Sequence, residues 1–251
     1  MTRISVELVP RDIEVLKEEV KTIKEKLSDV DFINIPDLLS CDTRSWDGAN
    51  IAKAYFDDVV PHLRAMDFDF TKELPIKDKL REYNIKEVLV IEGDPPQSML
   101  YQVYPTISTD IIKKFSEEMP EITVYAGIDQ YRSSMKEEEY RIRRKQLAGA
   151  KGFFTQPFFD MRYLEMYADL LDGLDIYWGV SPVLSERSVS YWRNKNNVIF
   201  PKDFEPTLEW NIEFARKVIE FARKHNHNVY LMPIKAKIMP YLEGVFAKLK
   251  I

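Results

Sequence analysis

Three polar side chains, Glu7, Asp94 and Gln156, each come at the end of an apolar segment of the sequence. A carboxyl group buried at the end of a strand has a raised pKa and can donate a proton near neutral pH. The amide of Gln156 precedes two aromatic residues, Phe158 and Phe159, and suits a flat ring that carries hydrogen-bond donors and acceptors. Together these residues suggest proton donation to a bound heterocycle.

Each of these residues also has a structural explanation. From pattern alone, Glu7 is more often a solvated residue on an edge strand, and Gln156 could simply cap a loop beside phenylalanines of the core. The functional interpretation therefore depends on whether the fold brings these strand ends to one place.

The segments before these residues have the composition of buried strands. The clearest is Val88–Ile91, whose four apolar residues are followed by Gly93, Asp94 and two prolines that stop both strand and helix. Eight such segments are found, at Ile4–Pro10, Phe32–Asp37, Asp57–Arg64, Val88–Ile91, Ile122–Gly127, Gly152–Gln156, Asp175–Val183 and Asn228–Pro233.

Helical patterns separate these strands. Asp12 is placed to cap the first helix, and Gly149 is placed to end the helix that follows the fifth strand. Asp160 is placed to start the helix that follows the sixth strand. The expected helices are Ile13–Leu27, Leu74–Tyr83, Ile111–Met119, Glu137–Leu147, Glu186–Arg193, Leu208–Lys224 and Ala236–Leu249. The alternation indicates a parallel α/β sheet, and eight units in 251 residues favour a closed (β/α)8 barrel in which residues 1–251 form a single domain. One rim then gathers Glu7, Asp37, His62, Asp94, Gly127, Gln156, Ser181 and Met232.

Composition excludes several classes of function. A net charge of −5 gives no basic surface for nucleic acid, and no apolar run approaches the ~20 residues of a membrane helix. Cys41 is the single cysteine and no His-x-x-x-His spacing occurs, so neither a disulfide nor a catalytic metal is expected. Glycine-rich phosphate loops are absent, and the start of the chain has no secretory signal pattern, so a cytoplasmic protein is expected.

Two further polar residues have competing explanations. Arg44, in the loop 38–46, could clamp a carboxylate or another anion of a substrate together with Asp37. Alternatively, Asp37 caps the turn and Arg44 lies on the surface. His62 ends the third strand, and a lone histidine is more often structural than catalytic.

The order of several short motifs resembles that of the methylenetetrahydrofolate reductases, over nearly the whole chain. The motifs are Ser5–Arg11 (SVELVPR), Asn34–Asp37 (NIPD), Pro61–Leu63 (PHL), Gly93–Pro96 (GDPP), Ala148–Ala150 (AGA), Thr155–Asp160 (TQPFFD) and Gly179–Val183 (GVSPV). The resemblance implies a (β/α)8 barrel that binds FAD at its carboxyl rim, takes hydride from NADH or NADPH, and reduces 5,10-methylenetetrahydrofolate to the 5-methyl form.

By the same resemblance, Glu7 is the acid that protonates the folate, and Asp94 lies between flavin and folate. Gln156 binds the pterin ring and Phe158 helps to line the pocket. The implied cofactor-binding residues are His62, Asp94, Tyr104, Gly127, Glu138 and Lys145. The residues do not distinguish tetrahydrofolate from another reduced pterin such as tetrahydromethanopterin.

The chain departs from the pattern of these enzymes on the cofactor side. Glu92 stands where an arginine precedes Gly-Asp, Gly127 stands where a tyrosine is expected, and Pro36–Leu39 replaces a Thr-Tyr-Gly-Ala run. These departures favour a second hypothesis: a folate- or pterin-binding barrel without reductase activity. Such a barrel would be a homo-oligomer or a partner subunit in one-carbon or corrinoid methyl transfer.

Overall fold

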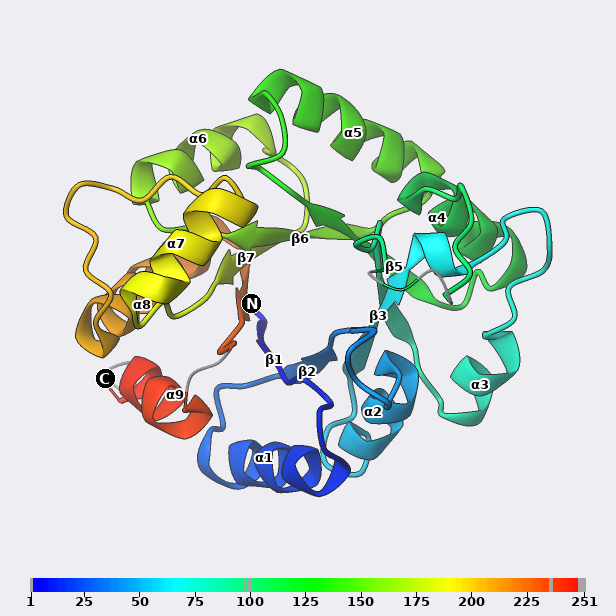
Figure 1. Ribbon diagram of the computed structural model, residues 1–251, viewed down its shortest axis with the longest axis horizontal. Coiled ribbons are helices and arrows are strands. Elements are labelled where there is room, and N and C mark those ends of the chain that lie inside the picture. Colours follow the sequence, from blue (N-terminus) through cyan, green and yellow to red (C-terminus); the bar gives the residue numbers. More distant parts are fainter. Residues whose placement is uncertain (1, 97, 99–100, 235–236, 248–251) are drawn as a thin grey trace.

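Eight parallel strands form a closed barrel in the computed structural model, which describes residues 2–96, 98, 101–234 and 237–247 (Figure 1). Each strand pairs with the next one in the sequence, and β8 pairs with β1 to close the barrel. The strands are β1 (Ile4–Glu7), β2 (Phe32–Ile35), β3 (Val59–Arg64), β4 (Glu87–Ile91), β5 (Thr123–Ile128), β6 (Gly152–Pro157), β7 (Ile176–Val180) and β8 (Asn228–Leu231).

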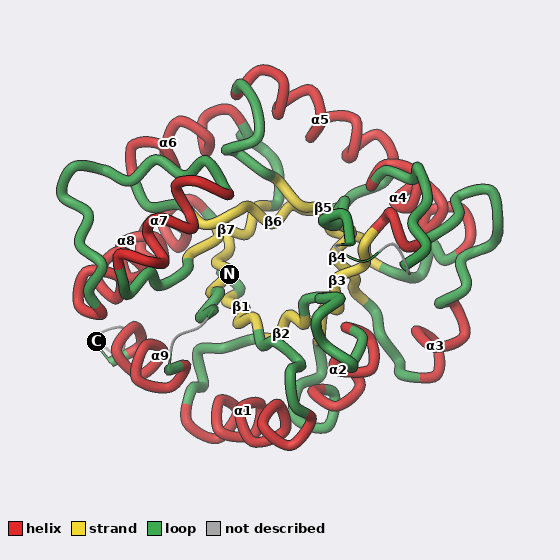
Figure 2. The backbone as a smooth tube through the Cα atoms, viewed as in Figure 1, coloured by secondary structure: helices red, strands yellow, loops and turns green. Residues whose placement is uncertain are grey.

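Helices surround the barrel and cover the outward faces of the strands (Figure 2). They are α1 (Ile13–Lys26), α2 (Ser45–Ala52), η1 (Ala65–Asp67), α3 (Lys77–Glu82), α4 (Ser108–Glu118), α5 (Met135–Ala148), α6 (Met161–Leu170), α7 (Glu186–Lys195), α8 (Leu208–His225) and α9 (Ile238–Phe246). The predicted α/β class and (β/α)8 barrel are therefore confirmed.

The predicted helix signals act as expected. Asp12 accepts a hydrogen bond from the Val15 amide at 2.9 Å, and Gly149 ends α5 with a φ of +121° that favours glycine. A difference is α2, which begins at Ser45 inside the predicted loop 38–46 and spans only 8 residues. Its sequence contains Gly48, which weakens helical propensity, so tertiary contacts rather than local pattern decide this helix.

The amino end of the barrel is closed by side chains. Arg3 donates hydrogen bonds to the hydroxyl oxygens of Tyr125 and Tyr177 at 3.2 and 3.0 Å. Above it lies an aromatic layer in which the rings of Phe154 and Tyr177 stack with their centroids 4.1 Å apart. A small molecule can therefore reach the barrel interior only from the carboxyl end, which is also where parallel barrels bind their ligands.

Two kinds of site are absent from the described part of the chain. No helix among residues 2–96, 98, 101–234 and 237–247 is long and apolar enough to cross a membrane. Nor do these residues contain a group of three or more His, Cys, Asp or Glu side chains that could hold a metal ion.

Candidate functional site

Four buried polar residues on adjacent strands form a cluster inside the barrel, below its carboxyl end. This inner quartet consists of Glu7 on β1, Asn34 on β2, His62 on β3 and Tyr230 on β8. The Tyr230 hydroxyl donates a hydrogen bond to Glu7 Oε2, and Asn34 Nδ2 lies 3.1 Å from His62 Nε2. The rings of His62 and Tyr230 meet edge to face at 6.2 Å, which joins the two pairs.

Burial changes the protonation of Glu7. Its side chain is 8% exposed, and loss of solvation raises its pKa from an ordinary value of 4.5 to about 7, although the hydrogen bond from Tyr230 acts in the opposite direction. At neutral pH Glu7 is thus present in both its acid and its carboxylate form. The predicted buried acid on the first strand is present, and the alternative of a solvated edge residue does not apply.

His62 is neutral, because burial lowers its pKa to about 3. An amide nitrogen can only donate, so Nε2 of His62 accepts from Asn34 and the ring proton is assigned to Nδ1. The Oδ1 atom of Asn34 is buried and has no hydrogen-bond partner among the described residues. His62 therefore orients Asn34, and like Glu7 it is buried, with 5% of its surface exposed.

Gln156 lies at a break in the β6–β7 pairing. The register shifts between Phe154 and Pro157, and such bulges redirect side chains near functional sites. The Gln156 side chain is exposed, and its amide makes no hydrogen bond within the described residues. An amide with free donors and acceptors at the barrel mouth is available to a ligand.

The backbone of this bulge is held by residues that sequence reasoning missed. Gln130, which is 1% exposed, donates from Nε2 to the Gln156 carbonyl at 2.7 Å. The Thr155 hydroxyl donates to the same oxygen and accepts from the Gly179 amide at 2.8 Å. The amide of Gln156 therefore projects from a fixed backbone, which reduces the entropy lost when a ligand binds.

The mouth opposite the inner quartet is lined by small residues. An added Cβ at Gly127 would meet only Ile91 Cγ2, at 3.4 Å, so there is open space beside β5. At Gly179 a Cβ would lie 2.5 Å from the Thr155 carbonyl oxygen, which requires glycine for the close approach of β6 and β7. The β5 side of the mouth is therefore less filled by side chains at Gly127 than the β6–β7 side is at Gly179.

Asp94 lies three residues beyond β4 and its side chain is exposed. Gly93 has a φ of +89°, and Arg64, buried at 5% exposure, donates from Nη2 to the Asp94 carbonyl at 2.8 Å. Arg64 thereby ties the turn after β4 to β3. Glu7 and Asp94 both lie at carboxyl ends of strands, as predicted, but only Glu7 is buried.

Asp37 and Arg44 pair with each other. Arg44 donates to the two carboxylate oxygens of Asp37 at 2.9 and 2.5 Å and to Asp67 at 2.8 Å, and its guanidinium lies over the Trp46 ring. Asp37 also accepts from the Ser45 amide at 3.2 Å, at the start of α2. The predicted alternative in which Asp37 caps the turn matches these contacts, and Arg44 is already engaged by two acids.

The residues matched to a cofactor diphosphate are engaged by the protein itself. Lys145 donates to the Gly127 carbonyl at 2.6 Å, and Glu138 accepts from the Asp129 amide at 3.1 Å. Glu92 accepts from both the amide and the hydroxyl of Ser108, at 3.1 and 2.7 Å, on the first turn of α4. A carboxylate thus holds the helix start that could otherwise receive a phosphate.

Of two other predicted residues, Phe158 lies away from any ligand surface and Tyr104 is partly exposed. Phe158 is fully buried and packs against Tyr163 and Trp178 outside the barrel, so it has no face for a ligand. Tyr104 lies in the segment between β4 and α4, where its backbone amide donates to the Met66 carbonyl at 2.8 Å. Sequence order alone could not show that Phe158 points outward.

Two cavities share the lining residue Ile234, just after β8. A small one of about 100 Å³ is lined by Glu7, and a larger one of about 490 Å³ is lined by Arg187, Tyr191 and Trp192 on α7. An acid lines one of these cavities, and an arginine and two aromatic rings line the other, with Ile234 between them.

Comparison with known proteins gives one distant sequence relative, and no family model matches. The chain is 22% identical over 147 residues to the 5,10-methylenetetrahydrofolate reductase of Buchnera aphidicola subsp. Schizaphis graminum (strain Sg), which is 57% of this chain and 50% of that protein. The chain spans about half the length of the relative. The predicted relationship to these reductases is confirmed as a distant homology.

Among solved structures, an uncharacterized protein from Clostridium thermocellum that binds two copies of 5-methyl-5,6,7,8-tetrahydrofolic acid has a TM-score of 0.64. It is 14% identical, with 97% of this chain and 94% of that chain covered. A 2,3-dimethylmalate lyase and an oxaloacetate acetylhydrolase each have a TM-score of 0.61, at 9% and 10% identity, covering 99% of this chain and 80% of theirs. At these identities the likeness establishes the barrel fold.

Proposed function

We propose that this chain binds a reduced folate or a related reduced pterin at the carboxyl mouth of the barrel. The observation that carries the proposal is the buried Glu7 carboxyl, hydrogen-bonded to Tyr230, on the same rim as the unpaired amide of Gln156. The distant reductase relative and the structural neighbour that binds 5-methyltetrahydrofolic acid support the choice of ligand.

The chemistry of the rim suits such a ligand. A reduced pterin presents amide-like donors and acceptors at its pyrimidine edge, which the Gln156 side chain can match. Glu7, with a pKa of about 7, can hold a proton close to a ring nitrogen at neutral pH. The acidic tail of a folate can extend past Ile234 into the cavity beside α7, where Arg187 offers a guanidinium for a carboxylate.

The residues on the cofactor side differ from the pattern of the flavin-binding reductases. Glu92 places a carboxylate on the start of α4, Lys145 donates to the Gly127 carbonyl, and Glu138 accepts from the Asp129 amide through one oxygen while its other oxygen is buried without a partner among the described residues. A diphosphate at the start of α4 would approach the Glu92 carboxylate, in a cavity of about 470 Å³ that Arg132, Arg141 and Arg144 also line. The proposed folate binding uses none of these residues, so it requires no flavin, and it suits a barrel that presents a methyl-bearing folate to a partner in one-carbon transfer.

Reductase activity is a second candidate, and the protonation of Glu7 favours it. Opening the five-membered ring of 5,10-methylenetetrahydrofolate needs a proton, and an acid with a pKa of about 7 is suited to supply it. In this candidate, NADH or NADPH provides the hydride.

Calorimetric titration with 5-methyltetrahydrofolate, without FAD and then with FAD, tests the proposal. Binding is expected without flavin, Gln156→Ala should weaken it about tenfold, and the exposed helical amide variant Gln146→Ala should bind as the wild type does. Binding that appears only with FAD, or that Gln156→Ala leaves unchanged, would contradict the proposal. The reductase candidate is tested separately, by measuring the oxidation of NADH or NADPH in the presence of 5,10-methylenetetrahydrofolate. If the chain is a reductase, Glu7→Gln should abolish this oxidation.

A further inference from the structure

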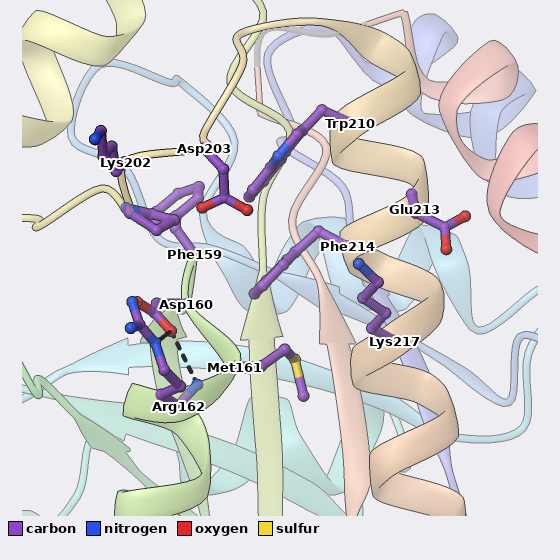
Figure 3. A pocket seen from close by; sticks show the side chains of 11 residues that line it. Phe159, Asp160, Met161, Arg162, Lys202, Asp203, Trp210, Glu213, Phe214 and Lys217 are labelled. Carbon is purple, nitrogen blue, oxygen red and sulfur yellow. Dashed lines mark hydrogen bonds and ion pairs between the residues drawn. The ribbon is translucent and has the colours of Figure 1, made fainter.

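A second cavity lies outside the barrel, between the start of α6 and the amino-terminal half of α8 (Figure 3). Its volume is about 650 Å³, within the range of roughly 300–1,000 Å³ that is typical of small-molecule sites. We call it the α6–α8 cavity. It shares no lining residue with the cavities at the barrel mouth.

One wall of the α6–α8 cavity consists of aromatic rings that other rings hold in place. Trp210 and Phe214 stack almost in parallel, with their planes 6° apart and their centroids separated by 5.2 Å. Phe204 packs edge to face on Trp210 at 4.6 Å, and Phe159 is held by Phe200 at 4.8 Å. The wall is therefore fixed before a ligand arrives, and it presents flat apolar surface.

The charged groups at the rim divide into paired and unpaired ones. Arg162 binds Asp160 at 2.6 Å, and Glu213 lies 3.6 Å from Arg216. In contrast, no hydrogen bond or ion pair within the described residues involves the side chains of Lys202, Asp203 and Lys217. These three side chains surround the aromatic wall, with Asp203 next to Trp210 and Lys217 next to Phe214 (Figure 3). The cavity thus offers two ammonium groups, one carboxylate and a stacking surface.

We propose that the α6–α8 cavity binds a second molecule of the same folate class, a flat heterocycle joined to a dicarboxylate tail. The inference rests on the proposed function for the identity of the ligand and extends it to a separate site. The aminopyrimidine edge of a pterin has two adjacent N–H donors that match a carboxylate such as Asp203. The rings stack on Trp210, and the two carboxylates of the glutamate tail pair with Lys202 and Lys217.

The other simple ligand classes match this set less well. A nucleoside polyphosphate would bring three or more negative charges close to Asp203 and Glu213, with two lysines to balance them. A purely apolar ligand would make no use of these three exposed side chains, of which Asp203 otherwise interacts only electrostatically, with Arg162. A planar donor-bearing ring with two carboxylates is the composition that uses each unpaired group once.

The stoichiometry of 5-methyltetrahydrofolate binding tests this inference on the intact chain. Calorimetry of the wild type is expected to give two equivalents per chain. The double variant Lys202→Gln/Lys217→Gln should weaken one of them about tenfold, or roughly 3-fold for each exposed charge pair lost. Lys224→Gln, an exposed lysine two turns further along α8, is the matched control and should retain both equivalents.

The variants at the two sites show whether the α6–α8 proposal or the proposal of folate binding at the barrel mouth is wrong. One equivalent in the wild type that Gln156→Ala weakens and the double lysine variant does not would overturn the second site and leave the mouth proposal standing. One equivalent that only the lysine variant weakens would place the folate in the α6–α8 cavity and overturn the mouth proposal. Quenching of fluorescence that is lost in Trp210→Phe, a conservative change, independently reports a ligand on the aromatic wall.

Discussion

The substitution Glu7→Gln should change how the stability of the barrel depends on pH. Burial raises the pKa of Glu7 from 4.5 to about 7, so between these values the folded protein holds a proton that the unfolded chain releases. Because the folded state binds more protons in this window, the contribution of Glu7 to stability is greatest below pH 4.5 and is lost as the pH rises through 7. Glutamine has nearly the same shape, accepts the same hydrogen bond from Tyr230 and does not titrate.

The magnitude follows from the shift of about 2.5 pH units, which is the difference between 7 and 4.5. At about 1.4 kcal/mol per unit, ionised Glu7 costs roughly 3 kcal/mol above pH 7. Less than about 1 kcal/mol of this cost is present at pH 5, so wild type and variant should diverge by about 2.5 kcal/mol between pH 5 and 8.5.

Urea denaturation at pH 5 and pH 8.5 measures this divergence. The stability of Glu7→Gln relative to the wild type should rise by about 2.5 kcal/mol on going to the higher pH. Glu14→Gln, whose side chain is 81% exposed, is the control and should show no such rise. An equal difference between wild type and Glu7→Gln at the two pH values would refute the assignment of Glu7 as a buried acid with a raised pKa.

Three further substitutions test neighbouring features. Tyr230→Phe removes the hydrogen bond that lowers the Glu7 pKa, so the carboxyl signal followed by NMR should titrate at a higher pH than in the wild type; an unchanged midpoint would contradict the pairing. His62 has a pKa lowered to about 3, so its own contribution to stability falls as the pH drops below 6.5, by about 2 kcal/mol at pH 5 and opposite in sign to that of Glu7. The stability of His62→Gln relative to the wild type should therefore be about 2 kcal/mol higher at pH 5 than at pH 8.5 in the same urea measurements, and an equal difference at the two pH values would contradict the lowered pKa. Gly179→Ala should destabilise the barrel by roughly 1–3 kcal/mol because its Cβ would lie 2.5 Å from a backbone oxygen. Gly127→Ala, with one contact at 3.4 Å, should fold normally. Equal losses of stability in urea denaturation would refute the close approach of β6 and β7 at Gly179.

The fold was predictable because each level of the sequence indicates the same structure. Short apolar runs alternate with helical patterns, and local signals such as Asp12 and Gly149 mark helix ends that the barrel retains. The place of Glu7 at the end of a short apolar strand was predictable in the same way, but its burial was not, because the pattern alone fits a solvated edge-strand residue more often.

The partners within the site were not predictable, because they depend on contacts across the barrel. Tyr230 lies 223 residues from Glu7 in the sequence, and Gln130 lies 26 residues from Gln156. Neither residue belongs to a motif, and each reaches its partner only because the closed barrel brings their strands together. Phe158 shows the opposite case. It lies inside a recognisable motif, but its side chain packs into the core outside the barrel and away from the site.

The two departures at β4 and β5 act on the same part of the mouth. Glu92 brings a carboxylate to the start of α4 and accepts hydrogen bonds from the amide and the hydroxyl of Ser108, which disfavours a phosphate at that helix start. Gly127, on the adjacent strand, leaves open space where a larger side chain would stand, and its carbonyl receives the ammonium group of Lys145. One change disfavours an anionic cofactor and the other makes room for a ring. Since the inner quartet on the opposite strands is unaffected by either, both changes are consistent with the proposal of a barrel that binds a reduced pterin without a flavin diphosphate.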